Sequence, residues 1–212
     1  WYLKYHAGIH LSWNGMTADL PEVLPAVTQK ERHETNIPYR YAYNYCTFSY
    51  SMAFWDWERW QQEIDWMALH GVNLSLVLTG TESVWKNVLA KLGYSKNEIN
   101  DFVSGSGFTA WWLMNNLEGW GGPNPDSWYI QQEQLQQKIV KRMREYGIEP
   151  VLPGYCGMVP HNAKEKLGLN VVDPGLWCSY NRPAFLQPED ERFEEISSIY
   201  YKELTKLYGK SK

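Results

Sequence analysis

The sequence has little of what marks the specialised classes of protein. Its three cysteines, Cys46, Cys156 and Cys178, are spaced like neither a zinc site nor a CxxC redox pair, so we interpret them as small buried residues. The 20 basic and 24 acidic residues are interspersed, which excludes the basic surface typical of nucleic-acid-binding proteins. No apolar run approaches the roughly 20 residues of a membrane-spanning helix. No signal peptide is visible, although the chain starts at Trp1 rather than at methionine.

Motifs for cofactors and for common catalytic groups are also missing. The sequence has no GxGxxG or GK[ST] nucleotide fingerprint and no GxSxG elbow, and its five histidines lack HExxH or other paired ligand spacing. We therefore expect no cofactor and no metal site. Asn73-Leu74-Ser75 matches a glycosylation sequon, but it falls within a predicted strand, so we expect its acceptor amide to be buried and unused.

Aromatic residues are abundant, with 12 tryptophans and 15 tyrosines. Tryptophan and tyrosine combine an apolar ring with a polar tip. Saccharides present apolar C–H faces between hydroxyl groups, so exposed rings are suitable platforms for them. Most of these rings must nevertheless form the core of the protein.

The order of the predicted elements indicates an α/β protein. We expect residues 1–38 to be the C-terminal end of a small α/β domain and its linker, with a strand at 9–13 that ends at Asn14-Gly15, and residues 39–212 to be the first part of a TIM-barrel domain. Predicted strands lie at about 40–49, 72–79 and 148–153, and predicted helices at about 57–70, 83–92, 96–103, 128–146, 162–167 and 189–208. A complete eight-fold barrel needs about 250 residues, so these three βα units predict a partial (β/α)8 barrel.

The first predicted strand carries a run of alternate tyrosines. Residues 39, 41, 43 and 45 are all tyrosine, and a strand would place them on one face and Asn44 and Cys46 on the other. Tyr50 follows in the next loop, and Trp111 and Trp177 lie in long segments after the second and third strands. Because the carboxyl ends of barrel strands meet at one rim, we expect these five residues to form a sugar site. Either tryptophan could instead simply cover the top of the barrel.

Glycoside hydrolysis usually needs two carboxylates. Glu82 follows the second strand, Asp56 follows the exit of the first strand, and Asp65 lies on a helix. Helix capping or solvation explains each of them more readily than catalysis does, although Glu82 could bind a sugar hydroxyl.

Several strings resemble the α-N-acetylglucosaminidases of glycoside hydrolase family 89. They are IHLSW at 9–13, NYCTFSY at 44–50, WDWERW at 55–60, EIDWMAL at 63–69, GVNL at 71–74, VLP at 151–153, SY at 179–180 and PED at 188–190. The resemblance extends over nearly the whole chain. It implies an N-terminal α/β domain, a (β/α)8-like barrel and then a helical domain, of which this chain is the end of the first and the start of the second.

The resemblance also implies a retaining exo-glycosidase for terminal α-linked N-acetylglucosamine. The acid/base glutamate of the family lies in an Asn-Glu pair after the fourth strand and the nucleophile lies later, whereas Asn97-Glu98 here falls in a predicted helix. We therefore expect no catalytic residue in this segment, which would be inactive alone. Asn44, Cys46, Tyr50, Trp111 and Trp177 correspond by position to substrate-binding residues. The implied partners are a terminal GlcNAc-containing glycan and the rest of the protein's own barrel and helical domain, with no nucleic acid and no membrane, in an extracytoplasmic compartment.

Two other functions remain open at this point. The chain could be a standalone carbohydrate-binding module that keeps the aromatic rim without catalysis. It could also be an intracellular α/β enzyme of another reaction type that uses Glu82 or Cys46.

Overall fold

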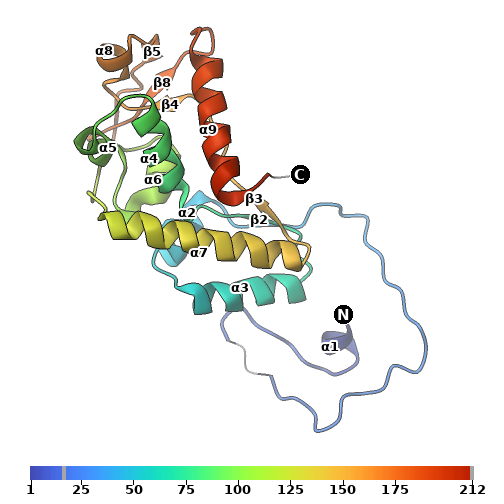
Figure 1. The fold of residues 1–212 in the computed structure, drawn as a ribbon. Helices are drawn as coiled ribbons and strands as arrows, with labels where there is room; N and C mark the ends of the chain where they lie inside the picture. The colour runs from blue at the N-terminus through green and yellow to red at the C-terminus, as the bar shows by residue number, and fades with distance from the viewer. Residues whose placement is uncertain (16–17, 211–212) are drawn as a thin grey trace.

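The computed structural model describes residues 1–15 and 18–210. Figure 1 shows a body of helices around a small central sheet, with residues 1–15 and 18–40 running beside it as a long, mostly extended segment. That segment begins with a short helix, α1 (Tyr2–Tyr5). The predicted strand at 9–13 is wrong, because the structure has only an isolated bridge there, between Ser12 and Gly15. The predicted domain boundary after residue 38 stays a prediction.

The central sheet consists of three parallel strands. β1 (Tyr41–Ala42), β2 (Leu74–Leu76) and β3 (Glu149–Val151) lie in the order β1-β2-β3. Tyr41 pairs with Leu74, and Leu74 pairs with Glu149. Parallel strands in sequence order need crossover helices between them, and this arrangement confirms the predicted βα rhythm.

The helices of the barrel segment agree with the predicted ones to within a few residues. They are α3 (Trp57–Leu69), α4 (Thr81–Lys91), α5 (Lys96–Phe102), α7 (Asp126–Glu145), α8 (Ala163–Leu167) and α9 (Phe193–Tyr208). Local signals explain their starts: the Asp56 carboxylate accepts the Arg59 N–H at 2.9 Å, and Ser95 and Glu98 form a capping box. Helices α3 and α7 pack side by side, as do α4 and α9 (Figure 1).

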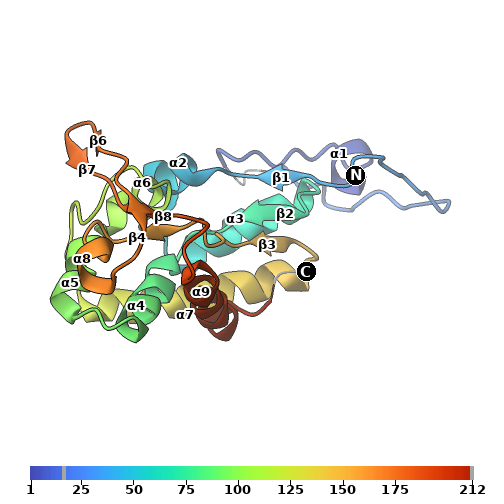
Figure 2. The same ribbon diagram turned by 90° about the horizontal axis from the view of Figure 1, so that it is seen from above.

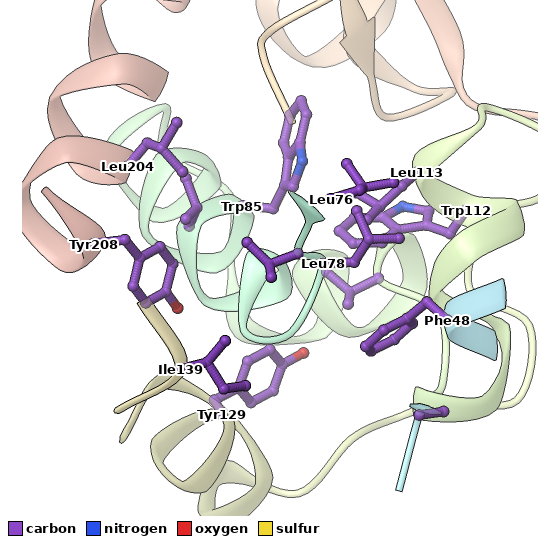
Figure 3. Packing of buried hydrophobic residues seen from close by; sticks show 14 of the residues in the cluster. Phe48, Leu76, Leu78, Trp85, Trp112, Leu113, Tyr129, Ile139, Leu204 and Tyr208 are labelled. Carbon is purple, nitrogen blue, oxygen red and sulfur yellow. The ribbon is translucent and has the colours of Figure 1, made fainter. Parts of the chain in front are cut away.

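The hydrophobic core surrounds the exit of β2. In Figure 3, Leu76 and Leu78 lie between aromatic and aliphatic side chains of α4, α6 (Thr109–Leu113), α7 and α9. The largest fully buried side chains include Trp60, Trp112 and Tyr200. Most of the tryptophans that the sequence provides are therefore at least half-buried, as expected.

The first predicted strand is much shorter than residues 40–49. The strand ends at Ala42, and Tyr43 has a left-handed backbone with φ 74°. Asn44 then caps a helix α2 (Tyr45–Thr47), which continues as a π-helix η1 (Phe48–Met52). The predicted shared face of the four tyrosines is therefore wrong. An asparagine that caps a helix outweighs the alternation of tyrosines before it.

Residues 158–188 contain more structure than the single short helix that the sequence predicts. β4 (Met158–Val159), β5 (Val171–Val172) and β8 (Ala184–Leu186) form an antiparallel sheet in the order β4-β8-β5. β6 (Leu176–Trp177) and β7 (Tyr180–Asn181) form a separate hairpin. Strands of two or three residues are too short to show a period in the sequence.

The interpretation of the cysteines as buried residues is wrong. Cys156 and Cys178 are exposed, and Cys46 is half-buried. Cys178 lies in the turn of the β6–β7 hairpin, with φ 48°, and Cys156 lies in the loop after β3. Position in a turn decides their exposure, and residue type does not.

Asn73 lies directly before β2, with both ends of its amide in use. Its Oδ1 accepts the N–H of Arg40 at 2.8 Å, and its Nδ2 donates to the carbonyl of Pro38 at 2.8 Å. A glycan on this nitrogen would break the link between the linker and the sheet. We expect no glycosylation of Asn73 on expression in a glycosylating host, and peptide mass spectrometry of the 71–86 region would detect any occupancy that contradicts this.

Candidate functional site

The chain that leaves β1 forms one wall of the candidate site. Asn44 is exposed, and its Oδ1 accepts hydrogen bonds from the N–H and the hydroxyl of Thr47, both at 3.0 Å. Its NH2 group has no hydrogen-bond partner among the described residues. Cys46 follows in α2, which packs on α6. The capping bond therefore fixes the Asn44 side chain and leaves two N–H donors for a ligand.

Tyr50 and Trp111 lie against each other. Their ring centroids are 5.3 Å apart with an interplanar angle of 88°. Tyr50, in η1, is 76% exposed, and Trp111 is half-buried. The Ser49 hydroxyl accepts the N–H of Ala110 at 3.0 Å, which ties η1 to α6. The sequence placed Trp111 in a loop, whereas it lies in the short helix α6.

The ring pair continues into a longer row, which we call the aromatic array. Its members are Tyr50, Trp111, Phe108, Trp120 and Tyr180, and the successive ring centroids lie 5.3, 6.2, 6.0 and 4.5 Å apart. Figure 2 shows α6 and the β6–β7 hairpin, which carry Trp111 and Tyr180, at the end of the molecule opposite α1. Sequence reasoning missed three of its members, Phe108, Trp120 and Tyr180. The aromatic and glycine content of residues 111–125 was a signal for Trp120, and the SY string at 179–180 was a signal for Tyr180.

Trp177 is the outlying member of the predicted site. It lies in β6 rather than in a loop, and it pairs with Tyr180 across the hairpin. It is half-buried and packs against the main core. The structure therefore brings Asn44, Tyr50 and Trp111 onto one packed group of elements and places Trp177 at the far end of the aromatic array. Their role in binding stays a prediction.

The candidate carboxylates have structural surroundings. Asp56 caps α3, and Asp65 forms an ion pair with Arg142 at 3.4 Å. Glu82 is buried in the first turn of α4, where the Trp128 indole donates to Oε1 at 2.9 Å. Burial raises the pKa of Glu82 to about 7, and the Trp128 bond opposes part of that rise. None of the three provides the exposed pair of acids that glycoside hydrolysis needs.

Residues 1–15 and 18–210 contain neither a cluster of metal ligands nor a helix that could span a membrane. In this part of the chain, no group of three or more histidine, cysteine or acidic side chains is placed to hold a metal ion. None of its helices combines the length and the apolarity needed to cross a membrane.

Three parallel βα units with an aromatic array at one end define the opening part of a (β/α)8 barrel. Residues 40–212 match the model of the α-N-acetylglucosaminidase (NAGLU) TIM-barrel domain. The chain belongs to this family, that of the glycoside hydrolase family 89 enzymes, as the resemblance of the motifs implied.

Comparison with individual relatives agrees with this assignment. Human α-N-acetylglucosaminidase is 44% identical over an alignment of 213 positions, which covers 98% of this chain and 29% of the human protein. The family 89 glycoside hydrolase from Clostridium perfringens is 37% identical with a TM-score of 0.92, over 98% of this chain and 24% of that one. It has been solved with 2-acetamido-1,2-dideoxynojirimycin and, in a form with two glutamates replaced by glutamine, with its substrate GlcNAc-α-1,4-galactose. The chain thus spans less than a third of the length of these relatives.

Proposed function

We propose that this chain is part of a retaining exo-glycosidase that hydrolyses terminal α-linked N-acetylglucosamine. In this proposal the segment supplies one side of the sugar pocket, and the catalytic carboxylates come from sequence downstream of it. The observation that carries the proposal is the exposed Tyr50 ring packed edge-on against Trp111, on the helical segment that the Asn44 amide caps.

The roles of these groups follow from their chemistry. An indole or phenol ring can stack on the apolar face of a pyranose, and an amide can donate to a hydroxyl or an acetamido oxygen. Cys46 lies two residues after Asn44 and would line the same wall. Trp177 would bound the site at the hairpin.

The carboxylates of this segment support the view that catalysis lies elsewhere. A retaining glycosidase places its two carboxyl groups about 5–5.5 Å apart. Asn97-Glu98, the sequence's own Asn-Glu pair, lies in α5 as predicted, and Glu98 is used in a capping box and an ion pair with Lys166 at 2.9 Å. Asp56, Asp65 and Glu82 have the structural partners described above.

The proposed partners follow from the same reasoning. They are a glycan that ends in α-linked N-acetylglucosamine, the remaining βα units of the barrel and a helical domain. The extracytoplasmic location that the family resemblance implies is proposed with them. A carbohydrate-binding module without catalysis is the alternative, since the aromatic array would suit binding alone.

Hydrolysis of an aryl α-N-acetylglucosaminide tests the proposed function. The full-length gene product is expected to release the aryl group, and residues 1–212 alone are expected to release none, because two catalytic carboxylates are needed. Release of the phenol is followed spectrophotometrically, with the aryl β-anomer as the control substrate.

Two results would contradict the proposal. Turnover by residues 1–212 alone would place the catalytic groups in this segment. A folded full-length protein that binds N-acetylglucosamine without turnover would favour the carbohydrate-binding module.

A further inference from the structure

A buried carboxylate, Glu63, joins three parts of the chain. Its side chain lies on the inner face of α3 and is 1% exposed. The Trp13 indole donates to Oε2 at 3.0 Å, and the Arg59 guanidinium contacts the same oxygen at 2.8 Å. The Tyr43 hydroxyl donates to Oε1. Both oxygens are thus in use, and their donors come from the N-terminal segment, from α3 and from the residue after β1.

Tyr43 is the residue at which the chain turns from the sheet into the candidate site. Its φ of 74° lies in the left-handed region, which a bulky residue adopts only when its surroundings hold it there. Asn44 follows it directly, and then α2 and η1 with Cys46 and Tyr50. The backbone direction at Tyr43 therefore decides where those three side chains lie.

The bond to Glu63 is the polar contact that holds the Tyr43 side chain. Burial and the neighbouring carboxylate raise the pKa of Tyr43, so its hydroxyl remains a donor throughout the physiological range. The ring also packs against the main core. A Tyr43 side chain held at both its apolar body and its hydroxyl cannot change its χ1 rotamer without losing these contacts.

Arg59 makes a buried negative charge tolerable at this position. It lies one helical turn before Glu63, and its guanidinium stacks on the Trp55 ring, 3.9 Å from the ring centroid. An unpaired buried carboxylate would be strongly destabilising. The ion pair offsets that cost, so the Glu63 carboxylate can serve as the acceptor for three donors.

We propose that Glu63 is a positioning residue of the sugar site, one that holds Tyr43 in its left-handed turn and couples Trp13 of the N-terminal segment to the wall formed by Asn44, Cys46 and Tyr50. This inference rests on the proposed function. Glu63 would not touch the sugar. It acts through the backbone of Tyr43, so its loss displaces the binding wall while the core of the barrel stays folded.

The test uses the full-length protein with an aryl α-N-acetylglucosaminide and with N-acetylglucosamine as a competitive ligand. Glu63→Gln removes the charge and presents an N–H to donors, and Tyr43→Phe removes only the hydroxyl. Glu203→Gln is the matched control, because Glu203, on α9, is 2% exposed and forms an ion pair with Lys91 of α4, and neither helix carries a residue of the aromatic array. Thermal unfolding identifies variants that lose structure.

We expect Glu63→Gln to lower kcat/KM by about 10- to 100-fold, because small misplacements of positioning groups have effects of this size. The loss should appear mainly as a higher KM, and the inhibition constant of N-acetylglucosamine should rise by a similar factor. Tyr43→Phe should show a smaller loss of the same kind, and the double variant should lose less than the product of the two. Glu203→Gln should keep kcat/KM within about twofold at a similar loss of thermal stability.

Three results would overturn the proposal. The first is that Tyr43→Phe and Glu63→Gln fold and keep wild-type kinetics. The second is that Glu203→Gln loses as much kcat/KM as Glu63→Gln does. The third is that the double variant loses the full product of the kcat/KM losses of Glu63→Gln and Tyr43→Phe. If Glu63→Gln does not fold, Tyr43→Phe decides alone. If the wild type binds the sugar but does not turn over, the proposed function fails, and the dissociation constant of N-acetylglucosamine in the same variants still decides the positioning role.

Discussion

Replacing Trp112 with alanine is expected to lower the free energy of unfolding by about 3–5 kcal/mol, the range measured for large aromatic residues in cores. Trp112 has no exposed surface and packs among aromatic side chains (Figure 3). Its ring centroid lies 5.5 Å from that of Phe102 and 6.2 Å from that of Trp85. Alanine would leave a cavity at the centre of this cluster. Denaturant unfolding followed by circular dichroism measures the loss.

Two further substitutions serve as controls for Trp112. Trp112→Phe should cost less, because it keeps an aromatic ring and removes an indole N–H that has no partner among the described residues. Ile130 lies on α7 and is 58% exposed, so Ile130→Ala should change the free energy of unfolding by no more than about 0.5 kcal/mol. A loss for Trp112→Ala no larger than that for Ile130→Ala would show that the packing described around α6 is wrong.

Replacing Glu82 with glutamine is expected to remove a large pH dependence of stability. In the folded protein, burial raises the pKa of Glu82 from 4.5 to about 7. The folded state therefore holds the proton more tightly than the unfolded state does. Stability is then full below about pH 4.5 and falls as the pH rises to about 7, by about 3 kcal/mol in total at 1.36 kcal/mol per pKa unit.

The surroundings of Glu82 explain why the charge is not compensated. Among the described side chains, the Trp128 indole is the one that donates to it, and Oε2 has no hydrogen-bond partner there. Tyr129 and Tyr208, the titratable groups beside it, carry no positive charge, and the pKa of each is raised by burial and, to a lesser extent, by Glu82. A glutamine side chain at this position would keep the acceptor for Trp128 without the buried charge.

Urea unfolding at several pH values between about 4.5 and 8 would measure this effect. Glu82→Gln should be nearly as stable as the wild type at the acidic end and more stable at neutral pH. Glu118 contributes a second pH dependence of stability with the same sign, because burial raises its pKa to about 8. Glu118→Gln is therefore the companion variant. Identical pH profiles for Glu82→Gln and the wild type would contradict the assignment.

The helices could be predicted from the sequence because their signals are local and long. α3, α7 and α9 each carry an apolar stripe over three or more turns, and Asp56 marks the start of α3. The three parallel strands were predicted in the right places, although each is shorter than expected. The motif strings also indicated the family, which the match of residues 40–212 to the family model confirms.

The candidate site was predictable only as a set of positions. The rule that barrel strands end at one rim selected Asn44, Tyr50 and Trp111, and the structure does place their elements together. The rule could not select Phe108, Trp120 or Tyr180, which belong to the aromatic array through contacts between distant segments. The exposed positions of Cys156 and Cys178 were missed because the prediction followed residue type, whereas both residues lie in a loop or turn.

The sequence by itself determined the helices, the βα order and the family, because capping residues, apolar periods and motif strings act over a few residues at a time. Tertiary structure decided the left-handed turn at Tyr43 and the burial of Glu63 and Glu82. Each of these depends on a partner far along the chain: Tyr43 on a carboxylate 20 residues away, Glu63 on an indole 50 residues away, and Glu82 on Trp128. The free energy of burying a charge or of holding a strained turn exists only once those partners have met.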